Sequence, residues 1–288
     1  MYPPAFDYQA PDTLEGALAA LGELGDEGRV LAGGQSLIPM MKLRLAAPSH
    51  LVDINRISEL SYVRRENGTL CIGALARHND VVGSADAKAS GVVSSAAPWI
   101  SDPLVRNRGT VCGSVAHCDP EGDWNSVMLA ARASVVAQSS AGSRTIGIDD
   151  FIVSFFTHSL EPGEMVTGVC VPIPSGASGG AYMKLERKIG DYATVGVATQ
   201  LELASDGTIA QAGIGLTAVN YQNTRASAAE DLLRGETPSD ELFAEAGAAA
   251  AAASDPQTDV RGDAEWKRHV VAVYTRRGLA QALASATS

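Results

Sequence analysis

The chain has 288 residues and a formal net charge of −11, with 45% hydrophobic and 19% charged residues. This composition is typical of a soluble protein with one large or two moderate domains. The acidic balance argues against nonspecific nucleic-acid binding, and no segment approaches the ~20 apolar residues that a transmembrane helix requires. The first residues carry neither a basic stretch nor an apolar core, so we expect no export signal and a cytoplasmic protein.

A helix, two short strands and a glycine loop make up the first predicted unit. Asp12 to Glu15 form a box-like helix start, apolar residues then repeat at helical spacing, and Gly25 ends the helix. Arg29–Ala32 and Leu51–Ile54 are predicted strands. The sequence Gly33-Gly34-Gln35-Ser36 directly follows the first of them. This small α/β unit therefore presents a glycine loop at the carboxyl end of a strand, where α/β folds commonly bind ligands.

The region from about residue 60 to residue 174 is predicted to contain short strands joined by loops. A second glycine-rich loop, residues 109–114, precedes a predicted helix at Ser126–Arg132. Prolines, glycines and serines between Pro172 and Gly180 resemble a linker. The strand candidates are Thr69–Ala74, Ser134–Gln138, Arg144–Ile148 and Met165–Ile173.

The last third is predicted to be an antiparallel sheet covered by helices. Its predicted strands are Ala181–Leu185, Thr194–Leu203 and Thr208–Val219. Its predicted helices are Ser227–Leu233, Asp240–Ala253 and Glu265–Ala284.

The two glycine loops together indicate a diphosphate. Glycines let bare backbone N–H groups approach an anion, and Ser36, Thr110 and Ser114 add hydroxyl donors. Two such loops could hold a dinucleotide from both sides, with a spacing unlike that of a Rossmann fold. Asp123 has two interpretations: it binds a polar edge of the cofactor, or it caps the helix that follows.

Other chemistries have weaker support. Gly213 to Ala218 match G-x-G-x-x-A, but the pattern continues as a strand rather than opening a helix, so we interpret the match as coincidental. Cys112, His117, Cys118 and Asp119 have no second ligand pair elsewhere, so we predict no metal site. The four cysteines contain no C-x-x-C pair, which argues against a disulfide framework and an iron–sulfur cluster. No nucleophile elbow or phosphate-binding P-loop is present, and we assign no catalytic residue.

A basic stretch, Lys184 to Thr194, is the third unusual segment of this acidic chain. It is either a solvated strand and turn, or a loop that reaches over the cofactor with the Tyr192 ring against it.

With these three stretches in this order, the chain resembles the FAD-binding medium subunits of the molybdenum hydroxylases, which include aerobic carbon monoxide dehydrogenase and N-heteroaromatic dehydrogenases. The resemblance covers essentially the whole chain. It implies an α+β, vanillyl-alcohol-oxidase-type FAD-binding fold with two α/β subdomains and a C-terminal domain of a three-stranded antiparallel sheet and helices. The implied domains are residues 1–176, with subdomains of about 1–57 and 58–176, and residues 177–288.

The resemblance also implies which residues contact FAD. The two glycine loops would cradle the diphosphate, Lys184 would make a polar contact, and Tyr192 would lie near the flavin ring. The implied set is Leu31, Ala32, Gly33, Gly34, Gln35, Ser36, Leu37, Ile100, Ser101, Gly109, Thr110, Val111, Cys112, Gly113, Ser114, Asp123, Val166, Lys184 and Tyr192.

The second loop departs from the T-I-G-G-N pattern of some members of this family. Cys112 replaces a glycine and adds a side chain where close backbone approach is expected. Ser114 replaces an asparagine and can still donate a hydrogen bond.

The function that the resemblance implies is electron transfer by a bound FAD. A small [2Fe–2S] subunit would deliver electrons, a large molybdopterin subunit would oxidise carbon monoxide or an N-heteroaromatic compound, and a quinone or oxygen would accept them. A dimer of heterotrimers is the expected assembly, in the cytoplasm, with association at the inner face of the membrane left open. The alternatives are a self-contained flavoprotein oxidoreductase and a cofactor-free interaction subunit.

Overall fold

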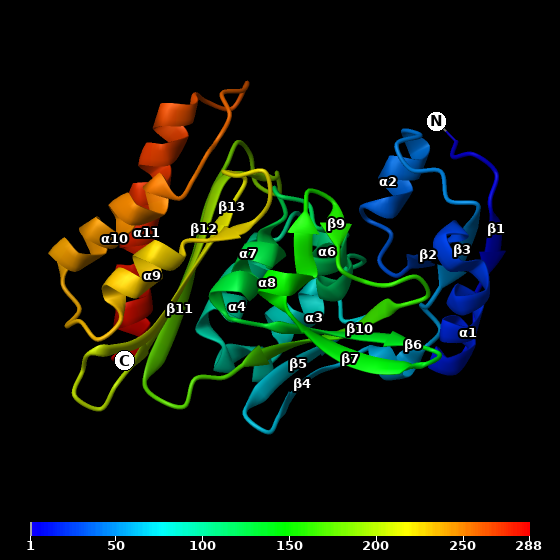
Figure 1. Cartoon of the computed structure of the whole chain (residues 1–288), viewed down its shortest axis with the longest axis horizontal. Coiled ribbons are helices and arrows are strands. Elements are labelled where there is room, and N and C mark those ends of the chain that lie inside the picture. The colour runs from blue at the N-terminus through cyan, green and yellow to red at the C-terminus, as the bar shows by residue number, and fades with distance from the viewer. Residues whose placement is uncertain (1) are drawn as a thin grey trace.

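The computed structural model describes residues 2–288 and begins with a small parallel sheet. Helix α1 starts where Thr13 caps it, accepting a 3.1 Å hydrogen bond from the Gly16 N–H, and ends at Gly25, whose φ is +53°. The sheet has the strand order β1-β3-β2, and the short outer strands β1 and β2 both run parallel to β3 (Figure 1). The elements are β1 Asp7–Gln9, α1 Leu14–Leu24, β2 Gly28–Leu31, α2 Leu37–Lys42 and β3 His50–Asp53.

The middle of the chain forms a five-stranded antiparallel sheet in the order β4-β5-β10-β6-β7. Its strands are β4 Val63–Glu66, β5 Thr69–Gly73, β6 Ser134–Ser139, β7 Gly142–Gly147 and β10 Met165–Pro172. A small hairpin and six helices accompany it: β8 Ile152–Ser154, β9 Thr157–His158, α3 His78–Gly83, α4 Gly91–Ala96, α5 Pro103–Arg106, α6 Val111–His117, α7 Asp123–Ala130 and α8 Ile148–Phe151. The predicted helix at 126–132 thus begins three residues earlier, at Asp123.

The C-terminal sheet has the strand order β11-β12-β13-β14 and is antiparallel throughout. Helices α9 to α11 cover one face, while α4 and α7 of the middle region pack on the other (Figure 1). Its elements are β11 Ser178–Glu186, β12 Ala193–Leu203, β13 Ile209–Thr217, β14 Thr224–Arg225, α9 Ser227–Leu233, α10 Asp240–Ala252 and α11 Ala264–Ala286. The predicted linker is wrong at both ends, because Pro172 ends β10 and Gly179 and Gly180 lie within β11. Only residues 173–177 connect the two strands.

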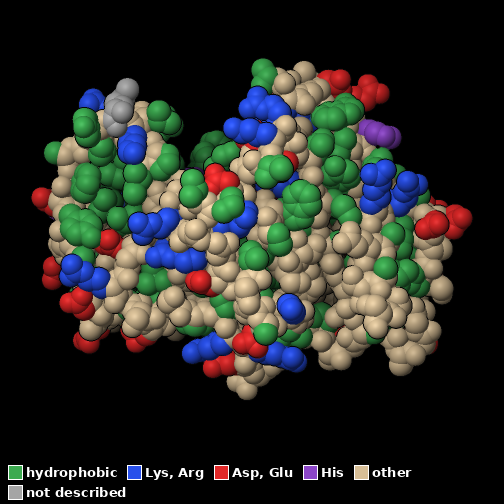
Figure 2. All heavy atoms as spheres, turned by 180° about the vertical axis from the view of Figure 1, so that it is seen from behind, with side chains coloured by type: hydrophobic (Ala, Val, Ile, Leu, Met, Phe, Trp, Pro, Cys, Tyr) green, Lys and Arg blue, Asp and Glu red, His purple; other side chains and the backbone are tan. Residues whose placement is uncertain are grey.

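The predicted α+β architecture is confirmed. One apolar cluster fills the N-terminal and middle regions, and a second lies between the C-terminal sheet and helices α9 to α11. Tyr182 and Ala198 of the C-terminal sheet belong to the first cluster, so the two parts share packing. Among residues 2–288, no helix is long and apolar enough to cross a membrane. Figure 2 shows basic side chains among acidic ones on the face seen there, despite the net charge of −11.

The glycines of the G-x-G-x-x-A pattern serve helix packing. They lie inside β13, as predicted, where a Cβ at Gly213 would come within 1.9 Å of the Ala130 carbonyl oxygen. A Cβ at Gly215 would come equally close, 1.9 Å, to the Ser126 carbonyl oxygen. Strand β13 therefore packs backbone to backbone against α7, which no side chain would permit.

We expect Gly215→Val to lower the free energy of unfolding by about 1–3 kcal/mol, because the added atoms overlap the α7 backbone. Denaturant unfolding measures this loss. Gly83→Ala is the matched control, since a Cβ at Gly83 meets nothing within 4 Å. An unchanged unfolding midpoint for Gly215→Val would contradict the close packing of β13 on α7.

Candidate functional site

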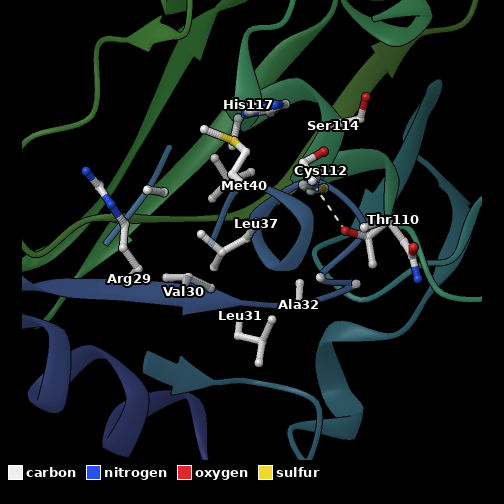
Figure 3. A pocket seen from close by; sticks show the side chains of 18 of the residues that line it. Arg29, Val30, Leu31, Ala32, Leu37, Met40, Thr110, Cys112, Ser114 and His117 are labelled. Carbon is white, nitrogen blue, oxygen red and sulfur yellow. Dashed lines mark hydrogen bonds between the residues drawn. The ribbon is translucent and has the colours of Figure 1, made fainter. Parts of the chain in front are cut away.

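A cavity of about 1300 Å³ runs between the N-terminal unit, the middle region and the start of the C-terminal sheet. It is lined by β2 and α2 on one side and by α6 on the other, with Leu37 and Met40 facing Thr110, Ser114 and His117 across it (Figure 3). Every residue of the predicted FAD-contacting set lines this cavity except Val111 and Lys184. The structure thus brings together two glycine loops that are far apart in the sequence.

The two glycine loops touch each other through their backbones. A Cβ at Gly33 would lie 2.4 Å from the Arg108 carbonyl oxygen and 2.7 Å from the Gly109 Cα. Gly34 has a φ of +72°, in the left-handed region that favours glycine. The first loop therefore requires glycine at Gly33 for contact and at Gly34 for conformation.

Asn55 and Arg77 tie the two loops together, and neither residue belongs to a motif that sequence analysis singled out. The Asn55 side-chain amide donates to the Ala32 carbonyl oxygen at 2.8 Å. Arg77 donates to the Asn55 side-chain oxygen and to the Arg108 carbonyl oxygen, both at 2.6 Å. This chain of bonds fixes the distance between the two loops, both of which line the cavity.

The first loop has backbone donors that the protein does not use. Within residues 2–288, the backbone N–H groups of residues 33–36 donate no hydrogen bond, and the Ser36 side chain makes no bond to the start of α2. In the second loop the Thr110 hydroxyl caps α6 by accepting from the Gly113 N–H at 3.1 Å. Successive free N–H groups beside a cavity form an anion-binding surface. These loops therefore fit a diphosphate.

Cys112 lies on helix α6 beside this surface. Its side chain is buried, at 2% exposure, and the thiol donates to the Ile72 carbonyl oxygen at 3.4 Å. Burial raises the pKa of the Cys112 thiol, which keeps it protonated. Helix α6 turns the thiol onto strand β5, although Cys112 still contributes to the cavity lining, so its effect on close approach of the cofactor stays a prediction.

Asp123 and Lys184 form a buried ion pair at the end of the cavity nearest the C-terminal sheet. The Lys184 ammonium donates to an Asp123 carboxylate oxygen at 2.9 Å and to the Trp99 carbonyl oxygen at 3.1 Å. The Tyr182 hydroxyl donates to the other Asp123 oxygen at 2.5 Å. Burial raises the pKa of Asp123, against the opposing effect of the Lys184 charge. The pair joins α7 to β11.

The capping interpretation of Asp123 is wrong, since Gly122 occupies the N-cap of α7 and the Asp123 carboxylate contacts Tyr182 and Lys184 instead. Asp123 reaches the cavity, while Lys184 lies behind it. The predicted polar contact of Lys184 with a cofactor stays a prediction; the contact that the structure shows is with Asp123, which Lys184 holds in place.

Ile100, Ser101 and Tyr192 line the cavity near this ion pair. Arg106 holds the turn before α5 by donating to the carbonyl oxygens of Ile100 at 3.1 Å and Ser101 at 2.8 Å. Tyr192 is 48% exposed. Burial, with the charges of Asp119 and Glu121, raises the pKa of Tyr192 to about 12, so its hydroxyl stays protonated at neutral pH.

Known proteins match the whole chain. Residues 4–174 match the family described as FAD binding domain in molybdopterin dehydrogenase, and residues 180–282 match the CO dehydrogenase flavoprotein C-terminal domain. The chain is 40% identical to the carbon monoxide dehydrogenase medium chain of Hydrogenophaga pseudoflava, over 97% of both chains. It is 39% identical to subunit alpha of the 6-hydroxypseudooxynicotine dehydrogenase complex of Paenarthrobacter nicotinovorans, over 98% of this chain and 96% of that one. A solved carbon monoxide dehydrogenase from Hydrogenophaga pseudoflava superposes with a TM-score of 0.94 at 42% identity, over 99% of both chains.

Proposed function

The chain belongs to the FAD-binding medium subunits of the molybdenum hydroxylases, and from this premise we propose that it passes electrons from the [2Fe–2S] clusters of a partner subunit to an external acceptor. Bound FAD supplies one- and two-electron chemistry that no amino-acid side chain provides. The protein's part is to hold the cofactor and to control its surroundings.

The observation that carries this proposal is the joined pair of glycine loops. Residues 33–36, whose backbone N–H groups make no hydrogen bond in the protein, line the cavity, and the Asn55–Arg77 bonds hold the second loop beside them. A preformed set of donors loses little entropy when an anion binds. We assign residues 1–176 to this cofactor-binding unit and residues 177–288 to the unit that covers the flavin end.

The surface around the cavity supports docking of a partner subunit. Trp99, Leu104 and Ile189 are 44%, 79% and 92% exposed, and they flank the cavity-lining residues Ser101 and Gly190. Exposed apolar side chains beside a site are typical of protein interfaces. The proposed assembly is a dimer of heterotrimers with a small [2Fe–2S] subunit and a large molybdopterin subunit, placed in the cytoplasm or at the inner face of the membrane.

The relatives named above act on carbon monoxide and 6-hydroxypseudooxynicotine. We place the oxidation of carbon monoxide or an N-heteroaromatic compound in the large partner subunit, with a quinone or oxygen as acceptor of the electrons.

We expect the isolated chain to retain about one FAD per polypeptide, with visible flavin absorption, and to oxidise no small donor on its own. Addition of the reduced iron–sulfur partner should bleach the flavin under anaerobic conditions. Absorption spectra before and after addition measure both properties. A colourless chain that does not take up FAD would contradict the proposal, and direct reduction by a small donor would favour a self-contained oxidoreductase.

A further inference from the structure

His78 is a buried histidine at the first position of α3 that reaches the same cavity. His78 is only 4% exposed, yet it is one of the residues that line the cavity. Its backbone N–H donates to the Gly109 carbonyl oxygen at 3.0 Å, which attaches α3 to the second glycine loop. A polar ring in this position needs a hydrogen-bond partner for each nitrogen.

One ring nitrogen of His78 has a partner that fixes the position of the proton. The indole Nε1–H of Trp124, a fully buried residue, lies 3.0 Å from His78 Nδ1. An indole N–H can only donate, so Nδ1 must accept. Burial, together with the charges of Arg106 and Arg77, lowers the pKa of His78 to about 4, so the ring is neutral at pH 7. The single ring proton therefore resides on Nε2.

The Nε2–H of His78 has no acceptor within residues 2–288 and lies beside Gly109. A Cβ at Gly109 would be 2.7 Å from Nε2, so only a glycine leaves this nitrogen open. Gly109 also meets the first loop, because a Cβ at Gly33 would lie 2.7 Å from its Cα. The donor thus sits where the two glycine loops meet.

The charges around His78 favour an anion. The positive charges of Arg77 and Arg106 act on the His78 ring. Arg77 donates to the Arg108 carbonyl oxygen and Arg106 to the Ser101 carbonyl oxygen, so both guanidinium groups are held in place by the backbone. A neutral N–H donor within this positive field interacts better with an anionic oxygen than with a neutral one.

We propose that His78 is a further cofactor-contacting residue: its Nε2–H donates to an anionic oxygen of the bound diphosphate, with Trp124 fixing the tautomer. The inference rests on the proposed function, because it takes FAD as the ligand of the cavity.

Two substitutions at this position separate the donor from the packing. In His78→Asn the amide oxygen can still accept from Trp124, but no atom reaches the position of Nε2. In His78→Gln the amide nitrogen reaches that position and can donate. We expect His78→Asn to bind FAD and ADP about tenfold more weakly than the wild type, and His78→Gln to restore most of the affinity. Riboflavin, which lacks the diphosphate, should bind all three proteins alike.

The measurement is titration of the deflavinated full chain with FAD, ADP and riboflavin. Equal affinity of wild type and His78→Asn for FAD and ADP overturns the inference, as does an equal loss for riboflavin, which would indicate a packing role. A wild-type chain that binds no FAD overturns the proposed function and this inference with it. If His78→Asn does not fold, ¹⁵N NMR of the wild-type imidazole decides: a protonated Nε2 signal that shifts when ADP is added supports the contact, and an unshifted signal overturns it.

Discussion

Replacement of Gly33 by valine is expected to abolish retention of FAD. The new Cβ would lie 2.4 Å from the Arg108 carbonyl oxygen, so the two glycine loops must separate. Arg77 holds that same carbonyl and, through Asn55, the first loop, so separation breaks the bonds that align the donors. The overlap should lower the free energy of unfolding by about 1–3 kcal/mol, a smaller effect than the loss of the cofactor.

The ratio of FAD to protein after gel filtration measures this loss, with denaturant unfolding run in parallel. Gly147→Val is the control, because a Cβ there meets nothing closer than an Asp150 oxygen at 3.6 Å. Gly113→Val should also lose FAD, since its Cβ would lie 2.7 Å from the Thr110 hydroxyl that caps α6. Unchanged FAD occupancy in both loop variants would show that the loops do not hold the diphosphate.

Lys184→Met is expected to lower the free energy of unfolding by about 3–5 kcal/mol. The Lys184 side chain is 1% exposed and the Asp123 side chain 8%, so methionine fills the space but leaves a buried carboxylate without its cation. Replacing both members, in Asp123→Asn/Lys184→Met, should recover part of this loss, because the Asp123 charge is removed. Glu186, whose carboxylate lies 3.5 Å from the Lys184 ammonium, still loses its cation.

The pH dependence of stability distinguishes this electrostatic cause from simple loss of packing. The pKa of Asp123 in the folded protein is raised above its ordinary value of 3.8. The stabilising contribution of Asp123 is therefore complete below pH 3.8 and is lost as the pH rises through the pKa of the folded protein. The Lys184 charge opposes the rise, so Lys184→Met should raise the pKa of Asp123 further. We therefore expect the single variant to lose more stability than the wild type between acidic and neutral pH, and the double variant to lose less.

Denaturant unfolding of the wild type and both variants across that pH range provides the measurement. If the free energy of unfolding changes with pH in the same way for the wild type and Lys184→Met, the Lys184 charge does not act on Asp123. A double variant as unstable as the single one would show that the loss does not come from the unpaired Asp123 charge.

Local sequence patterns predicted most of the secondary structure because their physical causes are local. Gly25 ends α1 as predicted, although the cap is Thr13 rather than Asp12, and the alternation or continuity of apolar residues placed the longer strands of all three regions. The short strands β1, β4, β8, β9 and β14 and the helices α2 to α6 and α8 were not predicted. The linker was misplaced for a reason that only packing supplies. Gly179 lies in β11, where a Cβ would be 2.0 Å from the Ala282 carbonyl oxygen, so this glycine serves the contact with α11.

The two glycine loops were recognisable in the amino-acid sequence, and their order with the basic stretch carried the resemblance that implied the family and its cofactor. The loops were recognisable because a diphosphate requires glycines and small hydroxyl residues at short spacing, which is a local property. The tertiary structure alone decided which residues hold the loops together and what each polar group faces. Asn55 and Arg77 join Ala32 to Arg108, segments more than fifty residues apart along the chain. The ring proton of His78 is fixed on Nε2 because Trp124, on another helix, donates a hydrogen bond to Nδ1. Such roles depend on burial and on partners distant in sequence, and no local pattern carries that information.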